Sequence, residues 1–150
     1  MRAVLQRVSK AILSIDGKEY SGIANGFVVL LGIEEQDDAN EIDWLVKKIA
    51  GMRVFADGDG KMNLSIDQVN GSCLVVSQFT LHASTKKGNR PSFIRAAKPD
   101  ISKPLYELFV HRLAAALMNG VMTGEFGANM QIELINDGPV TILLDSKNKE

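Results

Sequence analysis

The chain has 150 residues, a length that suits a single domain, and we expect one domain to span residues 1–150. Hydrophobic residues make up 45% and charged residues 23%, and the formal net charge of -1 gives no overall positive field that would indicate a nucleic-acid partner. One cysteine excludes an internal disulfide. The absence of a signal-peptide pattern, and of any apolar run near the ~20 residues of a membrane span, predicts a cytoplasmic protein with no membrane partner.

The first part of the chain has the pattern of strands joined by tight turns. In residues 1–15 apolar residues alternate with polar ones, and in places two apolar residues are adjacent. This pattern predicts one long strand or two strands with a bend. Asp16-Gly17 is a hairpin signal, and residues 18–21 would return as a short strand. Residues 27–33 are apolar at both odd and even positions, so this strand should be buried on both faces.

An acidic patch precedes the first predicted helix. Its members are Glu34, Glu35, Asp37 and Asp38. We expect a solvated loop that leads into a helix N-terminus, where carboxylates interact favourably with the helix dipole; metal binding is the alternative. Apolar residues at helical spacing then predict a helix over residues 38–50, with Gly51 as its stop.

A buried strand is predicted at residues 73–76, after the turn-like residues 70–72. The run is apolar and rich in β-branched residues, and we expect its Cys73 to be a buried, inert thiol. A hydroxyl, an amide, an aromatic ring and a second hydroxyl follow at residues 77–80. The end of a strand can hold such groups for chemistry. The alternative is a strand that simply becomes polar as it reaches the surface.

A basic segment comes next. Glycine and proline residues predict a loop through much of residues 83–104. A local basic patch can bind phosphate even where the net charge of the chain does not favour it; the alternative is a solvated loop. The candidate phosphate contacts are Lys86, Lys87, Arg90 and Arg95.

The last third combines a helix with a hairpin. An apolar stripe predicts a helix over residues 105–118, with Ser102 as its N-cap. Residues 121–127 are punctuated by glycine and should form a loop. Alternation on either side of a turn signal predicts a hairpin over residues 130–144, whose turn is residues 136–139.

Several kinds of site are excluded by the residues available. There is no thiol cluster and no histidine pair at ligand spacing, so a protein-held zinc is not expected. There is also no phosphate-binding Gly-Lys loop and no dinucleotide fingerprint. A hydroxyl nucleophile normally needs a base, and only His82 and His111 supply an imidazole. His82 lies two residues past Thr80, so an esterase that uses Thr80 as its nucleophile stays open.

Five short motifs carry a family resemblance, and their order is more specific than any one of them. They are Arg2-Ala3-Val4-Leu5-Gln6-Arg7-Val8, Gly60-Lys61-Met62-Asn63-Leu64, Ser77-Gln78-Phe79-Thr80-Leu81, Arg90-Pro91-Ser92-Phe93 and Asn136-Asp137-Gly138-Pro139-Val140-Thr141. Together they resemble the D-aminoacyl-tRNA deacylases nearly from end to end. The resemblance implies an α/β fold in which mixed, largely antiparallel sheets curve into a barrel-like core, with two main helices packed on one side.

The resemblance also implies an activity. The family hydrolyses the ester that joins a D-amino acid to the terminal ribose of tRNA, without a metal or other cofactor. In this chain Ser77, Gln78, Phe79 and Thr80 would build the catalytic pocket, and the amides of Phe79 and Thr80 would stabilise the oxyanion. A covalent role for Thr80, or a dimeric binding module without enzyme activity, are the alternatives.

Handedness poses a separate problem, because such an enzyme must accept many D side chains and reject every L one. A side-chain pocket discriminates by only about 1–3 kcal/mol per methylene and would recognise the identity of the side chain instead. A rigid main chain can instead sense the geometry at Cα. Gly138-Pro139 fits this role, because glycine allows close approach and proline stiffens the turn. The resemblance implies that this peptide is cis and enters the partner's site in a homodimer, with Phe126 and Met130 as further lining residues. Exclusion cannot reject glycine, so we expect glycyl-tRNA, including glycine mischarged on tRNA(Ala), as a substrate.

Overall fold

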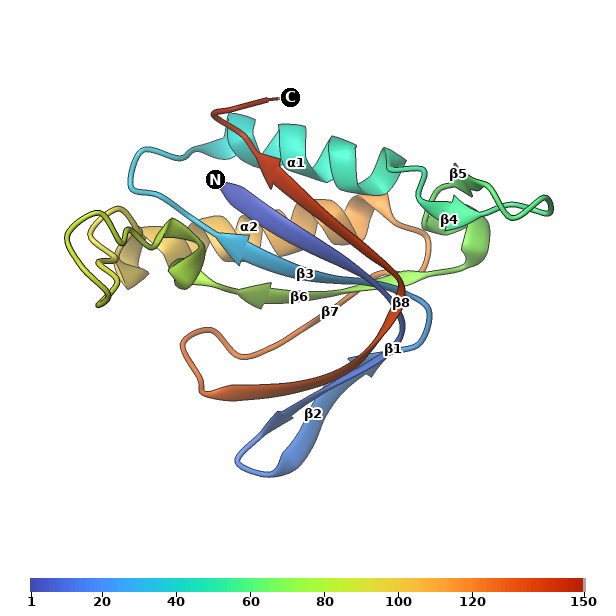
Figure 1. Ribbon diagram of the computed structural model, residues 1–150, viewed down its shortest axis with the longest axis horizontal. Helices are drawn as coiled ribbons and strands as arrows, with labels where there is room; N and C mark the ends of the chain where they lie inside the picture. The colour runs from blue at the N-terminus through green and yellow to red at the C-terminus, as the bar shows by residue number, and fades with distance from the viewer. Residues whose placement is uncertain (150) are drawn as a thin grey trace.

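The computed structural model describes residues 1–149 as one curved mixed sheet, two α-helices and a small second sheet (Figure 1). The strands are β1 (Arg2–Ile15), β2 (Lys18–Ile23), β3 (Gly26–Gly32), β4 (Phe55–Ala56), β5 (Met62–Leu64), β6 (Ser72–Ser77), β7 (Val121–Thr123) and β8 (Met130–Asp145). The helices are α1 (Ala39–Gly51), α2 (Pro99–Ala116) and the 3-10 helices η1 (Asp67–Val69) and η2 (Phe79–His82). Within residues 1–149 there is no helix with the length and apolar character needed to cross a membrane.

Strand β1 organises the sheet because it pairs with three other strands. Its first half pairs antiparallel with β3, its second half with β2, and nearly its whole length with β8. The β1–β8 pair curves strongly, so that β2 lies well away from the helices (Figure 1). Strands β3, β6 and β7 run parallel to one another. The curved, mixed sheet with two helices on one side confirms the predicted fold class.

Two hydrophobic clusters lie on opposite faces of the central strands. The first lies between the sheet and the helices and includes Leu5, Phe27 and Phe109. The second lies inside the curved half of the sheet and includes Leu13 and Leu74. Successive side chains of a strand point to opposite faces, so β3 and β6 contribute alternate residues to each cluster. The expected burial of residues 27–33 on both faces is confirmed in this way.

Helix α1 agrees with its predicted range, whereas α2 begins earlier than predicted. Its first residue is Pro99 rather than Leu105, and Ser102 lies inside the helix, where its hydroxyl donates to the carbonyl of Lys98 at 3.0 Å. A proline at the first position costs no helical hydrogen bond, because that N–H has no partner in any helix. Pro104 interrupts the pattern in the second turn, but Phe109 and other core side chains bury the helix. This packing outweighs the local preference.

The C-terminal region differs most from prediction. The expected loop at residues 121–127 contains β7, which pairs with β6. The expected hairpin at residues 130–144 is instead one strand, β8, which pairs with β1 on both sides of the turn-like motif. Val8 pairs with Asn136 and Gln6 with Thr141, so residues 137–140 form a wide bulge. Among the described residues β8 pairs only with β1, and such an edge strand tolerates a proline and a bulge.

Candidate active site at the end of strand β6

The end of β6 leaves two adjacent backbone donors free. The strand ends at Ser77, and the N–H of Gln78 still donates to the carbonyl of Leu31 at 2.7 Å. The chain then turns into η2, whose first residues are Phe79 and Thr80. The first N–H groups of a helix have no partner within it. Neither of these two N–H groups forms a hydrogen bond to any of residues 1–149, so both are available to a ligand.

Two cavities adjoin this segment. The larger, of about 350 Å³, is mostly apolar and extends to Phe93 and Phe126. The smaller, of about 250 Å³, extends to Met130. Ser77, Gln78 and Phe79 line both cavities. The structure therefore brings together three of the four predicted catalytic residues and both of the predicted lining residues, but it places Phe126 and Met130 in different cavities.

Aromatic contacts hold the walls of the larger cavity. The rings of Phe79 and Phe93 meet edge to face with their centroids 5.1 Å apart. Phe126 packs against Tyr106, with 5.7 Å between centroids. The buried Tyr106 hydroxyl donates to the carbonyl of Val75 at 2.9 Å, and burial raises the pKa of Tyr106 to about 12. Helix α2 is thus fixed to β6 just before the strand reaches the site.

Within residues 1–149 no base is hydrogen-bonded to the Thr80 hydroxyl. Its hydroxyl accepts a hydrogen bond from the side-chain amide of Gln78. The His82 side chain is fully buried, and neither of its ring nitrogens has a hydrogen-bond partner within the described chain. Burial lowers the pKa of His82 from its ordinary value of 6.5. A buried neutral imidazole that does not contact the hydroxyl is not arranged for a Ser-His type of catalysis.

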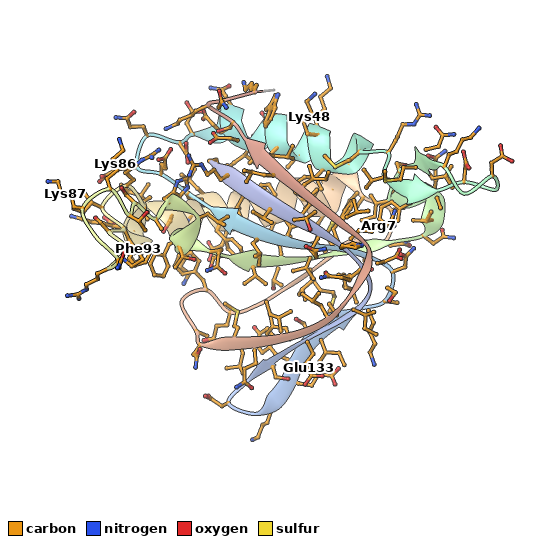
Figure 2. All side chains as sticks on the ribbon, viewed as in Figure 1. Arg7, Lys48, Lys86, Lys87, Phe93 and Glu133 are labelled. Carbon is orange, nitrogen blue, oxygen red and sulfur yellow. The ribbon has the colours of Figure 1, made fainter. Side chains whose placement is uncertain are left out.

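The Gly138–Pro139 peptide is cis, as the resemblance implies, but it lies away from this site. The pair lines neither cavity. It belongs to the bulge opposite Arg7, and Figure 2 shows Arg7 far across the molecule from Phe93. The single chain therefore does not bring Gly138-Pro139 to its own Phe79.

The predicted basic contacts fall into two groups. Lys86, Lys87 and Arg90 are exposed, and Figure 2 shows the two lysines at the same end of the molecule as Phe93. Arg95 lies on the same loop, but its Nη2 is 2.6 Å from Oε1 of Glu34. Three of the four side chains are therefore free to meet phosphates, whereas the fourth already has an anionic partner.

The prediction of a solvated loop at the acidic patch is wrong for two of its four carboxylates, which are buried. Glu34 and Asp37 are both buried, and Asp37 accepts from the ammonium of Met1 at 2.7 Å. Burial opposes the ionisation of Glu34, but the hydrogen bond from Arg95 and the nearby positive charges hold its pKa below the ordinary 4.5. Asp38 does cap α1, as expected for the helix start. The one available signal was that Glu34 directly follows a strand apolar on both faces.

Comparison with known proteins decides the family of this chain. The family model for D-Tyr-tRNA(Tyr) deacylase matches residues 4–145. The chain belongs to the D-Tyr-tRNA(Tyr) deacylase family. The match confirms the family that the five motifs predict, and it includes both the strand end at residues 77–81 and the bulge at residues 137–140 of this deacylase-family chain.

The curated relatives match this chain over its full length, and the solved structures match it over nearly all of it. A protein of Bacteroides fragilis named D-aminoacyl-tRNA deacylase is 61% identical over 150 residues, with 100% of both chains covered. One of the same name from Akkermansia muciniphila is 59% identical over the same span, again with 100% of both covered. The solved structure of a c-Myc DNA unwinding element binding protein has a TM-score of 0.91 and 39% identity, covering 97% of this chain and 98% of that one. A probable eukaryotic D-amino acid tRNA deacylase shares the fold, with a TM-score of 0.80, 18% identity and coverage of 95% and 97%.

Proposed function

We propose that this member of the deacylase family hydrolyses the ester bond of D-aminoacyl-tRNA and releases free tRNA and a D-amino acid. The observation that carries the proposal is the end of β6, where two unpaired N–H groups lie beside two cavities in a chain of this family. The ester is already activated and has a neighbouring ribose hydroxyl. The protein therefore needs to position the ester and to stabilise the charge that develops on its carbonyl oxygen.

The chemistry needs no nucleophilic side chain. Water attacks the ester carbonyl, and the N–H groups of Phe79 and Thr80 donate to the resulting oxyanion, a contribution of several kcal/mol in known oxyanion holes. The tetrahedral intermediate then expels the ribose oxygen, which takes up the proton that the attacking water gives up. The larger, aromatic cavity suits the terminal nucleoside, because Phe79 and Phe93 can stack against a base. The smaller cavity at Met130 then takes the amino acid.

In this proposal Gly138-Pro139 distinguishes D- from L-amino acids. Because the pair lies away from the chain's own Phe79, we assign it to the site of a second copy, which makes the proposed active unit a homodimer. The long free edge of β8, with exposed Ile135 and Leu143, offers a surface for that copy. Main chain that excludes an L side chain also admits glycine, so glycyl-tRNA, including glycine mischarged on tRNA(Ala), is a further substrate.

The remainder of the tRNA meets the basic loop. We assign the exposed Lys86, Lys87 and Arg90 to phosphates next to the acceptor end, and such contacts fix orientation without reading sequence. Arg95 contributes there only if it leaves Glu34. The whole chain acts as one domain, and the enzyme works in the cytoplasm, where tRNA is charged.

Matched D- and L-tyrosyl-tRNA test the proposal. The protein should release D-tyrosine rapidly, leave L-tyrosyl-tRNA at the rate of spontaneous hydrolysis, and release glycine from glycyl-tRNA. Equal acceleration of the D and L substrates would refute chiral selection, and acceleration of neither would refute the activity itself.

A further inference from the structure

One carboxylate joins the two segments that form the walls of the larger cavity. Oε1 of Glu34 lies 3.3 Å from Nδ1 of His82, the last residue of η2, and 2.6 Å from Nη2 of Arg95, in the loop of residues 83–98. Lys147 approaches the other oxygen, Oε2, at 3.5 Å. Only 12% of the Glu34 side chain is exposed, so the carboxylate itself is largely shielded from water, although its partner Arg95 is mostly exposed.

Both segments carry groups of the proposed site. Helix η2 begins with the free N–H groups of Phe79 and Thr80 and ends at His82. The loop carries Phe93, whose ring meets Phe79. A shift of either segment would therefore move the donors or the ring that faces the substrate.

Backbone contacts attach the same two segments to the sheet. The N–H of Ala97 donates to the carbonyl of Ile33 at 2.9 Å, and Arg2 donates from Nη1 to the carbonyl of Leu81 at 3.0 Å. Neither contact joins η2 directly to the loop. In the described chain the Glu34 carboxylate forms an ion pair with Arg95 of the loop and also lies against the His82 ring of η2, to which it makes no hydrogen bond.

We propose that Glu34 is a positioning residue for the deacylation, whose carboxylate holds η2 and the loop of residues 83–98 at the spacing that aims the Phe79 and Thr80 amides at the ester. The inference rests on the proposed function. It assigns Arg95 to the shape of the site rather than to a tRNA phosphate. It also gives a role to the buried His82, which the chemistry does not use.

The direct test is Glu34→Gln, which keeps the shape of the side chain and removes its charge. We expect kcat for D-tyrosyl-tRNA to fall about 10- to 100-fold, because small misplacements of catalytic groups have effects of that size, with KM changed far less. Hydrogen exchange at residues 79–98 should become faster. Glu35→Gln, at the exposed neighbour, and Asp43→Asn, which removes the ion pair with Arg112 between the helices, should change neither quantity.

A second variant covers the case in which Glu34→Gln fails to fold. Arg95→Ala removes a partner whose side chain is 57% exposed, and it should lower kcat by a similar factor. The double variant should be no worse than the stronger single one, because the two residues act through one contact. If Arg95 instead met a phosphate, Arg95→Ala would raise KM and weaken its dependence on salt, which would overturn the assignment.

The outcomes separate this inference from the proposed function. Wild-type protein that hydrolyses D-tyrosyl-tRNA, together with an unchanged kcat in Glu34→Gln, would overturn the inference and leave the function intact. Wild-type protein without activity would overturn the function. In that case exchange at residues 79–98 decides whether Glu34 holds the two segments, and unchanged exchange in Glu34→Gln and Arg95→Ala would overturn that as well.

Discussion

Arg7 holds Asp137 by two contacts: its Nε donates to the Asp137 carbonyl at 3.0 Å and lies 3.2 Å from Oδ2 of the same residue. Its guanidinium also donates to the carbonyl of Val54. Only 10% of the Arg7 side chain is exposed, whereas the Asp137 side chain is about half exposed, at 49%. The bulge that carries Gly138-Pro139 is thus fixed by a residue of β1, far away in the sequence.

Arg7→Lys should loosen rejection of L substrates. A lysine ammonium cannot reproduce the fork of a guanidinium, and a hydrogen bond to a charged group contributes about 1.5–3 kcal/mol. We expect the rate on L-tyrosyl-tRNA relative to the D substrate to rise about tenfold or more. The matched control is Arg53→Lys, which changes an exposed arginine bonded to Asn63. If Arg7→Lys left the ratio of the L rate to the D rate unchanged, Arg7 would have no part in the rejection of L substrates.

Gly138→Ala should disturb the bulge. A Cβ at this position would lie 2.9 Å from Cγ2 of Val140 and 3.1 Å from Nη2 of Arg7, and the φ of +124° is one that L side chains rarely adopt. We expect a loss of about 1–3 kcal/mol in the free energy of unfolding, measured in urea, and weaker chiral discrimination. Gly51→Ala is the control, since a Cβ there would meet no atom within 4 Å apart from its chain neighbours and its own helix backbone. Equal stability in the two variants would contradict the crowding described here.

The elements with a strong local pattern were predictable from sequence, and those set by distant partners were not. The strand at residues 27–33 and helix α1 follow from apolar spacing and an Asp38 cap. The motif at residues 136–139 has the composition of a turn, but its geometry depends on Arg7 and on continued pairing with β1, which composition does not reveal. Similarly, the apolar strand before Glu34 is the one local sign that it is buried, because its partners His82 and Arg95 come from later segments.

Thr80→Ala discriminates between a backbone mechanism and a nucleophilic one. The variant removes a hydroxyl that bonds Gln78 but leaves both amides in place. Loss of one neutral hydrogen bond, about 0.5–1.5 kcal/mol, should lower kcat by no more than about tenfold. Thr85→Ala, at an exposed threonine nearby, should have no effect. Complete loss of turnover, together with an acyl-enzyme that can be trapped in the wild type, would establish Thr80 as the nucleophile.

Tyr106→Phe should weaken the attachment of α2 to β6. The hydroxyl donates to the Val75 carbonyl at 2.9 Å in a buried setting, so its removal leaves that carbonyl without this donor. We expect a loss of about 1–2 kcal/mol in the free energy of unfolding by urea denaturation. Tyr20→Phe is the control, because Tyr20 is exposed. If both variants lost similar amounts of free energy of unfolding, the buried hydrogen bond of Tyr106 would contribute no specific stability.

His82 should make stability depend on pH in a defined window. Burial lowers its pKa below 6.5; the N-terminal ammonium and Arg2 lower the pKa further, whereas the Glu34 carboxylate opposes the shift. The unfolded chain therefore binds more protons than the folded one as the pH falls from 6.5 towards the lowered value, and stability is lost in that range. The contribution of Glu34, whose pKa is also lowered, is lost only below 4.5.

The measurement is the free energy of unfolding at several pH values. His82→Asn should reduce the slope between pH 6.5 and the lowered pKa, whatever its effect on absolute stability. His111→Asn, at an exposed histidine, should keep the slope of the wild type. A slope that is the same in His82→Asn and in the wild type would show that His82 does not titrate between the two states.

A crystal structure of the protein with a D-tyrosyl-adenosine analogue, in which an amide replaces the ester, tests the central claim most directly. The account predicts that the carbonyl oxygen of the analogue accepts from the N–H groups of Phe79 and Thr80, while main chain of Gly138-Pro139 from a second copy faces its Cα. An analogue bound at Phe79 with Gly138-Pro139 of every copy out of contact would contradict the account.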